Sequence, residues 1–165
     1  MRVLGIDPAL RNTGYGIIEP GASSGSFSVV DFGVIRNGQD LLHSHCLREI
    51  YRSLREKIEA AQPEAAAVEG IIYVQSHRTA ITMGAARAAA LLAVADAGIP
   101  VFEYAPTRVK SAATGRGGAQ KAQVGFMMRA ILGLTANPPA DAADALAVAL
   151  THAQSRAGLT QGIRL

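Results

Sequence analysis

The sequence has a single cysteine, Cys46, and few charged residues for its length. One thiol cannot form an internal disulfide, and it excludes a zinc site built on clustered thiolates. Charged residues make up 18% of the 165 residues and hydrophobic residues 49%, a balance typical of compact globular proteins rather than disordered chains. This length predicts one domain, spanning residues 1–165, that is large enough to bury a sizeable core.

The chain also lacks a long apolar run without charges. Residues 1–7 do not contain the apolar region of a signal peptide, because a charge arrives at position 7. The most hydrophobic stretch, residues 80–98, is interrupted by Arg87 and Asp96, and the gap between them is far shorter than the ~20 residues of a membrane span. We therefore expect a cytoplasmic protein without a membrane partner. The net charge of +3 is compatible with a polyanionic partner but is weak support by itself.

Hydrophobic periodicity predicts an α/β fold. Three short apolar segments joined by turns predict an antiparallel meander, and the pattern then changes to helical spacing. The expected strands are 3–6, 13–18, 27–35, 65–69 and 101–104, and the expected helices are 41–61, 77–97, 107–113, 119–132 and 140–157. Because helices separate the later strands, these strands should pair in parallel. The prediction is a five-stranded mixed sheet flanked by helices.

The predicted helix 77–97 is apolar nearly all round, so we expect it to be buried on both sides. One side can pack on the sheet. The other side is expected to meet a second copy of the chain, with many alanines permitting close approach. The alternative is that loops of the same chain cover it.

Four carboxylates adjoin apolar segments: Asp7, Glu69, Asp141 and Asp144. An ionised carboxylate beside an apolar core is costly unless something pairs with it, and no Lys or Arg lies within three residues of the last three. Strand ends place the first two at the edge of the sheet, and the last two share one helix face. Mg²⁺ and Mn²⁺ prefer oxygen ligands of this kind, and two such ions roughly 4 Å apart can clamp a phosphodiester.

Each acid also has a purely structural interpretation. Asp7 precedes Pro8 and can form a turn, Glu69 can be a loop acid, and Asp141 can cap a helix. Asp144 fits such an interpretation least well, because it lies too far into the helix to cap it and has apolar neighbours. Taken together, the four acids favour a metal site.

Basic residues follow the last predicted strand, around the glycine-containing loop 114–118. They are Arg108, Lys110, Arg116, Lys121 and Arg129. Glycines let a backbone approach phosphates closely, and the start of the next helix offers free N–H groups. This placement favours a nucleic-acid partner, although a solvated basic face is the common alternative.

Several motifs resemble those of RuvC-type Holliday-junction resolvases. Residues 5–16 (GIDPALRNTGYG) look like the opening motif of that family, Val68-Glu69 falls at its second acidic strand, and residues 140–152 resemble its C-terminal acidic helix. Residues 101–106 and Val109-Lys110 also fit, so the similarity covers nearly the whole chain in the right order.

The resemblance implies a ribonuclease-H-like fold, a homodimer, and cutting of four-way DNA junctions that depends on Mg²⁺ or Mn²⁺. It implies symmetric nicks in two strands of like polarity during recombination and repair. It further implies a branch-migration motor complex (RuvA and RuvB type) as partner. Under this resemblance the catalytic and metal-binding residues are Asp7, Glu69, Asp141 and Asp144.

The family's DNA contacts transfer to this chain with two departures. Lys110 and Lys121 match positions implicated in DNA binding near the scissile phosphate, and Arg78 and Arg116 are further expected contacts. An aromatic wedge that the family often carries corresponds here to Ile72, with Tyr73 beside it, and either side chain can intercalate or stack. The second departure is Ala9, where the family usually has Gly. This matters only if the position needs a positive φ.

Two other functions share parts of the pattern. The Gly-x-Asp opening with a later Thr-Gly also occurs in sugar kinases and actin-like ATPases, but these need two such domains and the chain has no second copy. A junction-binding module without cutting activity would be expected to have lost an acid, and none is missing. His152 lies about 12 Å along the helix from Asp144, too far to share its metal.

Overall fold

The structure is a computed structural model that describes residues 1–71, 76–118, 120–155 and 162–165. Three strands come first, helices and strands then alternate up to the fifth strand, and three helices precede the last strand. The strands are β1 (Val3–Asp7), β2 (Asn12–Pro20), β3 (Phe27–Arg36), β4 (Ala65–Glu69), β5 (Val101–Tyr104) and β6 (Ile163–Arg164). The helices are α1 (His43–Ala61), α2 (His77–Ala95), α3 (Pro106–Thr114), α4 (Lys121–Leu132) and α5 (Ala140–Ser155).

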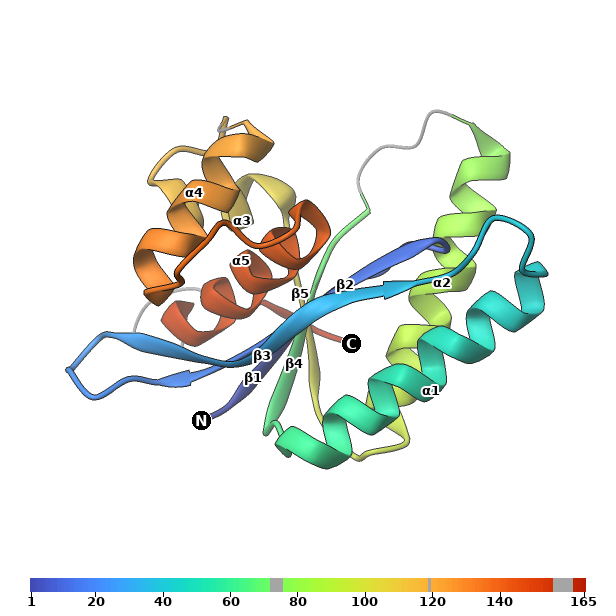
Figure 1. Ribbon diagram of the computed structural model, residues 1–165, viewed down its shortest axis with the longest axis horizontal. Coiled ribbons are helices and arrows are strands. Elements are labelled where there is room, and N and C mark those ends of the chain that lie inside the picture. Colours follow the sequence, from blue (N-terminus) through green and yellow to red (C-terminus); the bar gives the residue numbers. More distant parts are fainter. Residues whose placement is uncertain (72–75, 119, 156–161) are drawn as a thin grey trace.

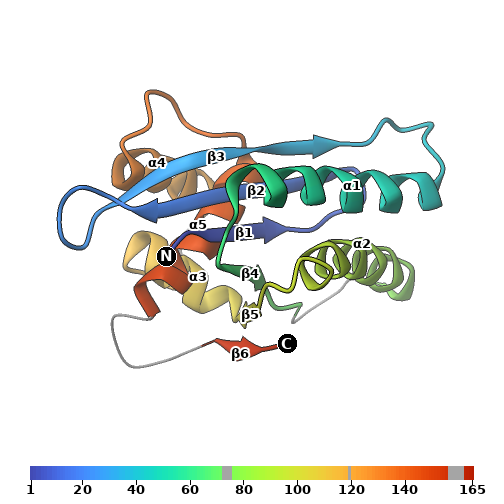
Figure 2. The ribbon, with the colours of Figure 1, turned by 90° about the horizontal axis from the view of Figure 1, so that it is seen from below.

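These elements form one mixed sheet with the order β3-β2-β1-β4-β5-β6, which Figure 2 shows from top to bottom. The first three strands are an antiparallel meander, and β4 and β5 extend the sheet in parallel with β1. Both features confirm the prediction. The two central strands, β1 and β4, therefore run in the same direction and end at the same edge of the sheet.

The predicted number of strands was wrong, because the sheet has six strands and not five. The additional strand, β6, pairs antiparallel with β5, with Phe102 opposite Arg164 and Glu103 opposite Ile163. A strand of two residues carries no periodicity that a sequence pattern can reveal. It forms because it completes hydrogen bonds along the edge of β5.

The helices cover the sheet in two layers, with α1 and α2 on one face and α3, α4 and α5 on the other (Figure 1). Alternation along the strands supplies a separate core to each layer. Leu4, Ile6 and Val68 pack toward α1 and α2, whereas Val3 and Ala67 pack toward α5. α1 is amphipathic, and its buried residues have the three-to-four spacing that the sequence predicts.

Helix α5 lies very close to the backbone of β1 and β2. A Cβ atom added at Gly5 would lie 1.9 Å from the Ala145 carbonyl oxygen, and one added at Gly14 would lie 1.9 Å from the Asp141 carbonyl oxygen. Any side chain at these two positions would push the helix away. Glycine in the middle of a strand thus marks the place where another backbone approaches.

Helix α2 packs on the chain with the side that carries its buried residues, and the side predicted to meet a second copy is exposed in the single chain. Its buried residues are Ala86, Ala90, Ala93 and Val94, whereas Ile81 is 71% exposed and Leu92 56% exposed. In the described part of the structure, α2 packs with one side on the chain, next to α1 (Figure 1). Among the described residues, it is the one helix long and apolar enough to cross a membrane, a property that core helices of soluble proteins share.

Candidate active site

Asp7 and Glu69 lie side by side at the ends of the two central strands. β1 and β4 pair in parallel, with Ile6 opposite Val68, so the next residue of each strand is an acid. Neighbouring strands are about 4.8 Å apart. By alternation, both side chains lie on the α5 face of the sheet, because Gly5 and Ala67 precede them by two residues on that face.

Helix α5 brings the other two acids to the same place. The Asp141 backbone rests against Gly14, which pairs with Asp7 across β1 and β2. Asp141 lies in the first turn of α5, and Asp144 follows one turn later on the same side of the helix. The close approach that the glycines permit therefore sets the position of both carboxylates relative to the strand ends.

Mutual repulsion and burial change the protonation of this cluster. The pKa of Asp7 is raised from 3.8 to about 7, first because burial disfavours the anion and next because Asp144 lies nearby, with Asp141 and Glu69 adding smaller repulsions. Burial and then the charge of Asp144 also raise the pKa of Glu69. These interactions show that the other three carboxylates lie near Asp7 at the ends of the central strands.

Two lysines partly offset this negative charge. The Lys121 ammonium lies 3.1 Å from Asp144 Oδ2, and the pair is asymmetric in exposure, since the lysine side chain is 75% exposed and the aspartate 21%. The charge of Asp144 raises the pKa of Lys121, and the lysine in turn lowers the pKa of Asp7. Lys110 lowers the pKa of Glu69. Both lysines come from helices distant in sequence, which is why no local partner was visible.

The chemistry of these donors fits a hard divalent cation, but the side chains do not yet form a coordination shell. Within the described ranges, no group of three or more His, Cys, Asp or Glu side chains is already arranged to hold a metal ion. Lys121 binds Asp144 instead, so a cation that enters must displace this ammonium. The donors are nevertheless all carboxylates, and the positive charge of Mg²⁺ or Mn²⁺ would offset the repulsion that contributes to the raised pKa values of Asp7 and Glu69.

A hollow of about 430 Å³ opens beside the acids. Its lining includes Asp7, Glu69, Met83, Arg87 and Pro106. The sequence patterns did not single out Arg87, which reaches from α2 to the end of β4. Its Nη1 donates to the Glu69 carbonyl oxygen at 2.7 Å, and its Nη2 donates to Glu103 Oε2. The hint in the sequence is that Arg87 interrupts the long alanine-rich part of α2.

The expected DNA contacts Arg78 and Arg116 do not line this hollow. Arg78 is the second residue of α2 and is exposed, and Arg116 is exposed in the loop after α3, where Thr114 Oγ1 accepts from its backbone N–H at 3.2 Å. Arg108, by contrast, donates to Ser155 Oγ at 2.9 Å and lies over the Tyr104 ring, so it belongs to a different surface. The expected wedge residues Ile72 and Tyr73 lie outside the described residues.

The turn after Asp7 tolerates Ala9. Positive φ angles at non-glycine residues occur within the described ranges only at Gln62. The turn is closed by Thr13, whose Oγ1 donates to the Ala9 carbonyl at 2.7 Å and accepts from its N–H at 3.3 Å. The departure from the family pattern at this position therefore costs no backbone strain.

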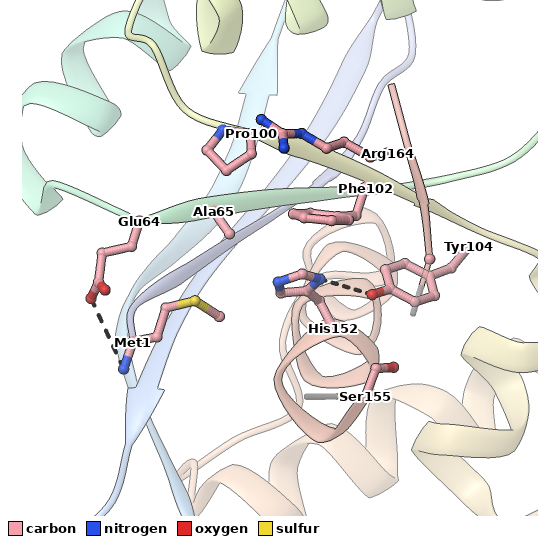
Figure 3. Close-up of a pocket in the computed structure, with 10 residues that line it drawn as sticks. Met1, Glu64, Ala65, Pro100, Phe102, Tyr104, His152, Ser155 and Arg164 are labelled. Carbon is pink, nitrogen blue, oxygen red and sulfur yellow. Dashed lines mark hydrogen bonds and ion pairs between the residues drawn. The ribbon is translucent and has the colours of Figure 1, made fainter. Parts of the chain in front are cut away.

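His152 takes no part in the acidic site, as its distance along α5 predicts. It is buried, and Figure 3 shows its ring beside Phe102 with Nδ1 directed at the Tyr104 hydroxyl, 2.8 Å away. The ring centroids of His152 and Phe102 are 4.5 Å apart. The pocket around these side chains also includes Arg164 of β6 and lies at the end of α5 remote from Asp141.

The sheet is mixed and has helices on both faces. Two acids lie at the ends of its central strands, and two more lie on a helix that crosses the sheet. Together these features define the ribonuclease-H-like class. Comparisons with known proteins agree. Residues 3–152 match the family model of crossover junction endodeoxyribonuclease RuvC. The chain belongs to this family.

Individual relatives cover nearly all of the chain. It is 50% identical over 152 residues to crossover junction endodeoxyribonuclease RuvC of Akkermansia muciniphila, which covers 92% of this chain and 90% of that protein. It is 47% identical over 154 residues to the protein of the same name from Chloroflexus aggregans, 93% of each chain.

Solved structures show the same similarity. T. thermophilus RuvC in complex with a Holliday junction substrate has a TM-score of 0.91 and 35% identity, covering 100% of this chain and 99% of that one. The yeast mitochondrial Holliday junction resolvase Ydc2 has a TM-score of 0.62 at 15% identity over 90% of this chain and 76% of that one, which shows a shared fold.

Proposed function

We propose that this protein resolves four-way DNA junctions as a metal-dependent endonuclease. It would nick two strands of like polarity at symmetric positions, in homologous recombination and DNA repair. Membership of the crossover junction endodeoxyribonuclease family supports this activity, as does the junction-bound structure of a relative. We also propose that residues 1–165 act as a single nuclease domain in the cytoplasm.

The observation that carries the proposal is the gathering of four carboxylates from three separate elements. Burial first, and then repulsion from the neighbouring carboxylates, raises the pKa of Asp7 to about 7, so the cluster without a cation is electrostatically unfavourable. Clusters of carboxylates with raised pKa values are typical of functional sites. We assign Asp7, Glu69, Asp141 and Asp144 as catalytic residues and as ligands for two Mg²⁺ or Mn²⁺ ions.

The acids and lysines would have distinct roles. When bound, the ions would supply an activated water and stabilise the leaving oxygen of the phosphodiester. Asp7 and Glu69, fixed at the strand ends, would hold the phosphate-facing side of the site, and Asp144 would complete it from α5. Lys121, once released from Asp144, would be free to bind the phosphate group, and Lys110 near Glu69 would add a second positive charge.

Residues outside the acidic cluster would hold the arms of the junction. Arg78 at the start of α2 and Arg116 after α3 are exposed, and we propose that both contact the DNA backbone. Ile72 or Tyr73 would wedge between base steps at the crossover. These roles come from the family resemblance and from the position of each residue along the chain.

A homodimer would give the enzyme two such sites for two strands. The exposed side of α2 carries Ile81 and Leu92, which a second copy of the helix would bury. Paired nicks of like polarity require a two-fold arrangement of active sites, which a symmetric dimer supplies. We further propose that the dimer works with a branch-migration motor complex of the RuvA and RuvB type.

The test is cleavage of a synthetic four-way junction with each strand labelled in turn. Wild-type protein with Mg²⁺ or Mn²⁺ is expected to nick opposite strands symmetrically and to leave linear duplex uncut. Asp144→Asn is expected to bind the junction in EDTA but not to cut it. An uncut junction at saturating wild-type protein with either metal would contradict the proposal and would favour a binding module.

A further inference from the structure

Arg87 holds the backbone of an active-site acid from the opposite face of the sheet. Its side chain is only 12% exposed, although it lies on the most apolar helix of the chain. A guanidinium in such a place is costly unless all its hydrogen bonds are made. Here one nitrogen binds the Glu69 carbonyl oxygen at 2.7 Å and another binds the Glu103 carboxylate.

The peptide group after Glu69 is consequently held at both ends. Arg87 donates to its carbonyl oxygen, while its N–H, on Gly70, donates to the Tyr104 carbonyl at 2.9 Å. A peptide group is planar, so fixing both polar atoms fixes the ψ angle of Glu69. The direction of the Glu69 side chain on the α5 face is therefore set by contacts on the α2 side and along β5.

Glu103 completes this arrangement. It follows Phe102 on β5 and pairs in register with Val68 of β4, so its carboxylate lies beside the end of the strand that carries Glu69. The planar guanidinium can donate in two directions at once, to a carbonyl and to a carboxylate, which an ammonium group cannot do in the same geometry. Arg87 and Glu103 together link α2, β4 and β5 at the hollow.

We propose that Arg87, supported by Glu103, is a positioning residue that orients Glu69 for the divalent cation. The inference rests on the proposed function, since it assumes that Glu69 is a metal ligand. Groups that orient ligands from outside the coordination shell are typically worth 10–100-fold in metal affinity or activity. Helix α2 also carries Arg78, a proposed DNA contact, and the exposed apolar side proposed to bind a second copy of the chain. The hydrogen bond from Arg87 therefore connects this helix to Glu69, the proposed metal ligand.

The test compares Arg87→Lys with Arg55→Lys as a matched control. Arg55 also reaches a backbone carbonyl, that of Ala93 at 3.5 Å, and pairs with Glu59 at 3.3 Å, but it lies away from the acids. Both substitutions keep the charge and remove the planar donor. Two readouts are the rise in melting temperature with Mg²⁺ concentration, which needs no activity, and the Mg²⁺ dependence of junction cleavage. Junction affinity is measured in EDTA.

Arg87→Lys is expected to raise the half-maximal Mg²⁺ concentration about tenfold in both readouts, with junction affinity within about twofold of wild type. Arg55→Lys should leave both midpoints unchanged. A lower melting temperature with unchanged Mg²⁺ midpoints would overturn the inference by showing a structural role only. An equal loss of junction affinity would also overturn it, because Arg87 would then be a DNA contact.

Glu103→Gln provides a second variant if Arg87→Lys does not fold. It keeps an acceptor oxygen for Arg87, and a smaller shift of the Mg²⁺ midpoint in the same direction is expected. No shift in a folded Glu103→Gln protein would count against the proposal. If wild-type protein binds Mg²⁺ but cuts no junction, the proposed function fails, while the melting-temperature midpoints still decide the role of Arg87.

Discussion

Replacing Asp7 by Asn should stabilise the metal-free protein while removing its metal site. Between about pH 4 and pH 7 the folded protein keeps a proton on Asp7 that the unfolded chain has lost, because the pKa is raised from 3.8 to about 7. The ionisable group therefore lowers the free energy of unfolding progressively across this pH window. Above about pH 7, the decrease in the free energy of unfolding that Asp7 causes no longer changes with pH.

The magnitude follows from the size of the shift. One pKa unit corresponds to about 1.4 kcal/mol, so a shift of roughly three units costs about 4 kcal/mol at pH 8 as an upper bound. Relaxation and water entry in a partly open site reduce this, and about 2–4 kcal/mol is expected. For a chain of this size, the melting temperature of Asp7→Asn should exceed that of wild type by about 4–16 °C.

The assay is thermal unfolding by circular dichroism from pH 4 to pH 8, in EDTA and with Mg²⁺. Asp7→Asn should have a flatter stability profile over this range than wild type and should lose the rise in melting temperature that Mg²⁺ produces. Asp40→Asn, at an exposed position in the loop before α1, is the matched control and should behave like wild type. Equal or lower stability of Asp7→Asn at pH 8 in EDTA would refute the reasoning.

Further predictions concern packing, charge and assembly. Gly14→Ala should lower the melting temperature and abolish cleavage, because its Cβ would meet the Asp141 carbonyl at 1.9 Å, whereas Gly38→Ala, with no atom within 4 Å, should change neither. Lys121→Met should raise the pKa of Asp7 further, so the pH at which cleavage becomes half-maximal should move upward; an unchanged pH profile would contradict the assigned electrostatics. The Mg²⁺ concentration for half-maximal cleavage should increase as the pH falls below 7, since protons compete with the cation for Asp7; a pH-independent midpoint would exclude this competition. Ile81→Glu should convert a dimer to a monomer in sedimentation analysis without unfolding it, and a monomeric wild type would reject α2 as the interface.

The local sequence pattern was enough to predict most of the fold. The change from strand to helical periodicity located the elements, and the ranges of β4 and β5 agree with the prediction. Burial depends on alternation along a strand and on three-to-four spacing along a helix, both of which are properties of neighbouring residues. The acids at strand ends, and the pair one turn apart on α5, could be recognised for the same reason.

Contacts between distant segments decided the rest. No local pattern relates the residues that these contacts join. Examples are the ion pair between Lys121 and Asp144, the hydrogen bond from Arg87 to the Glu69 carbonyl, and the pairing of β6 with β5. The raised pKa of Asp7 is likewise a property of the assembled site, because both its burial and its charged neighbours come from other elements. The sequence alone was enough to identify the four acids. Their electrostatic interactions arise only in the folded protein, since these depend on distance in space and on the exclusion of water.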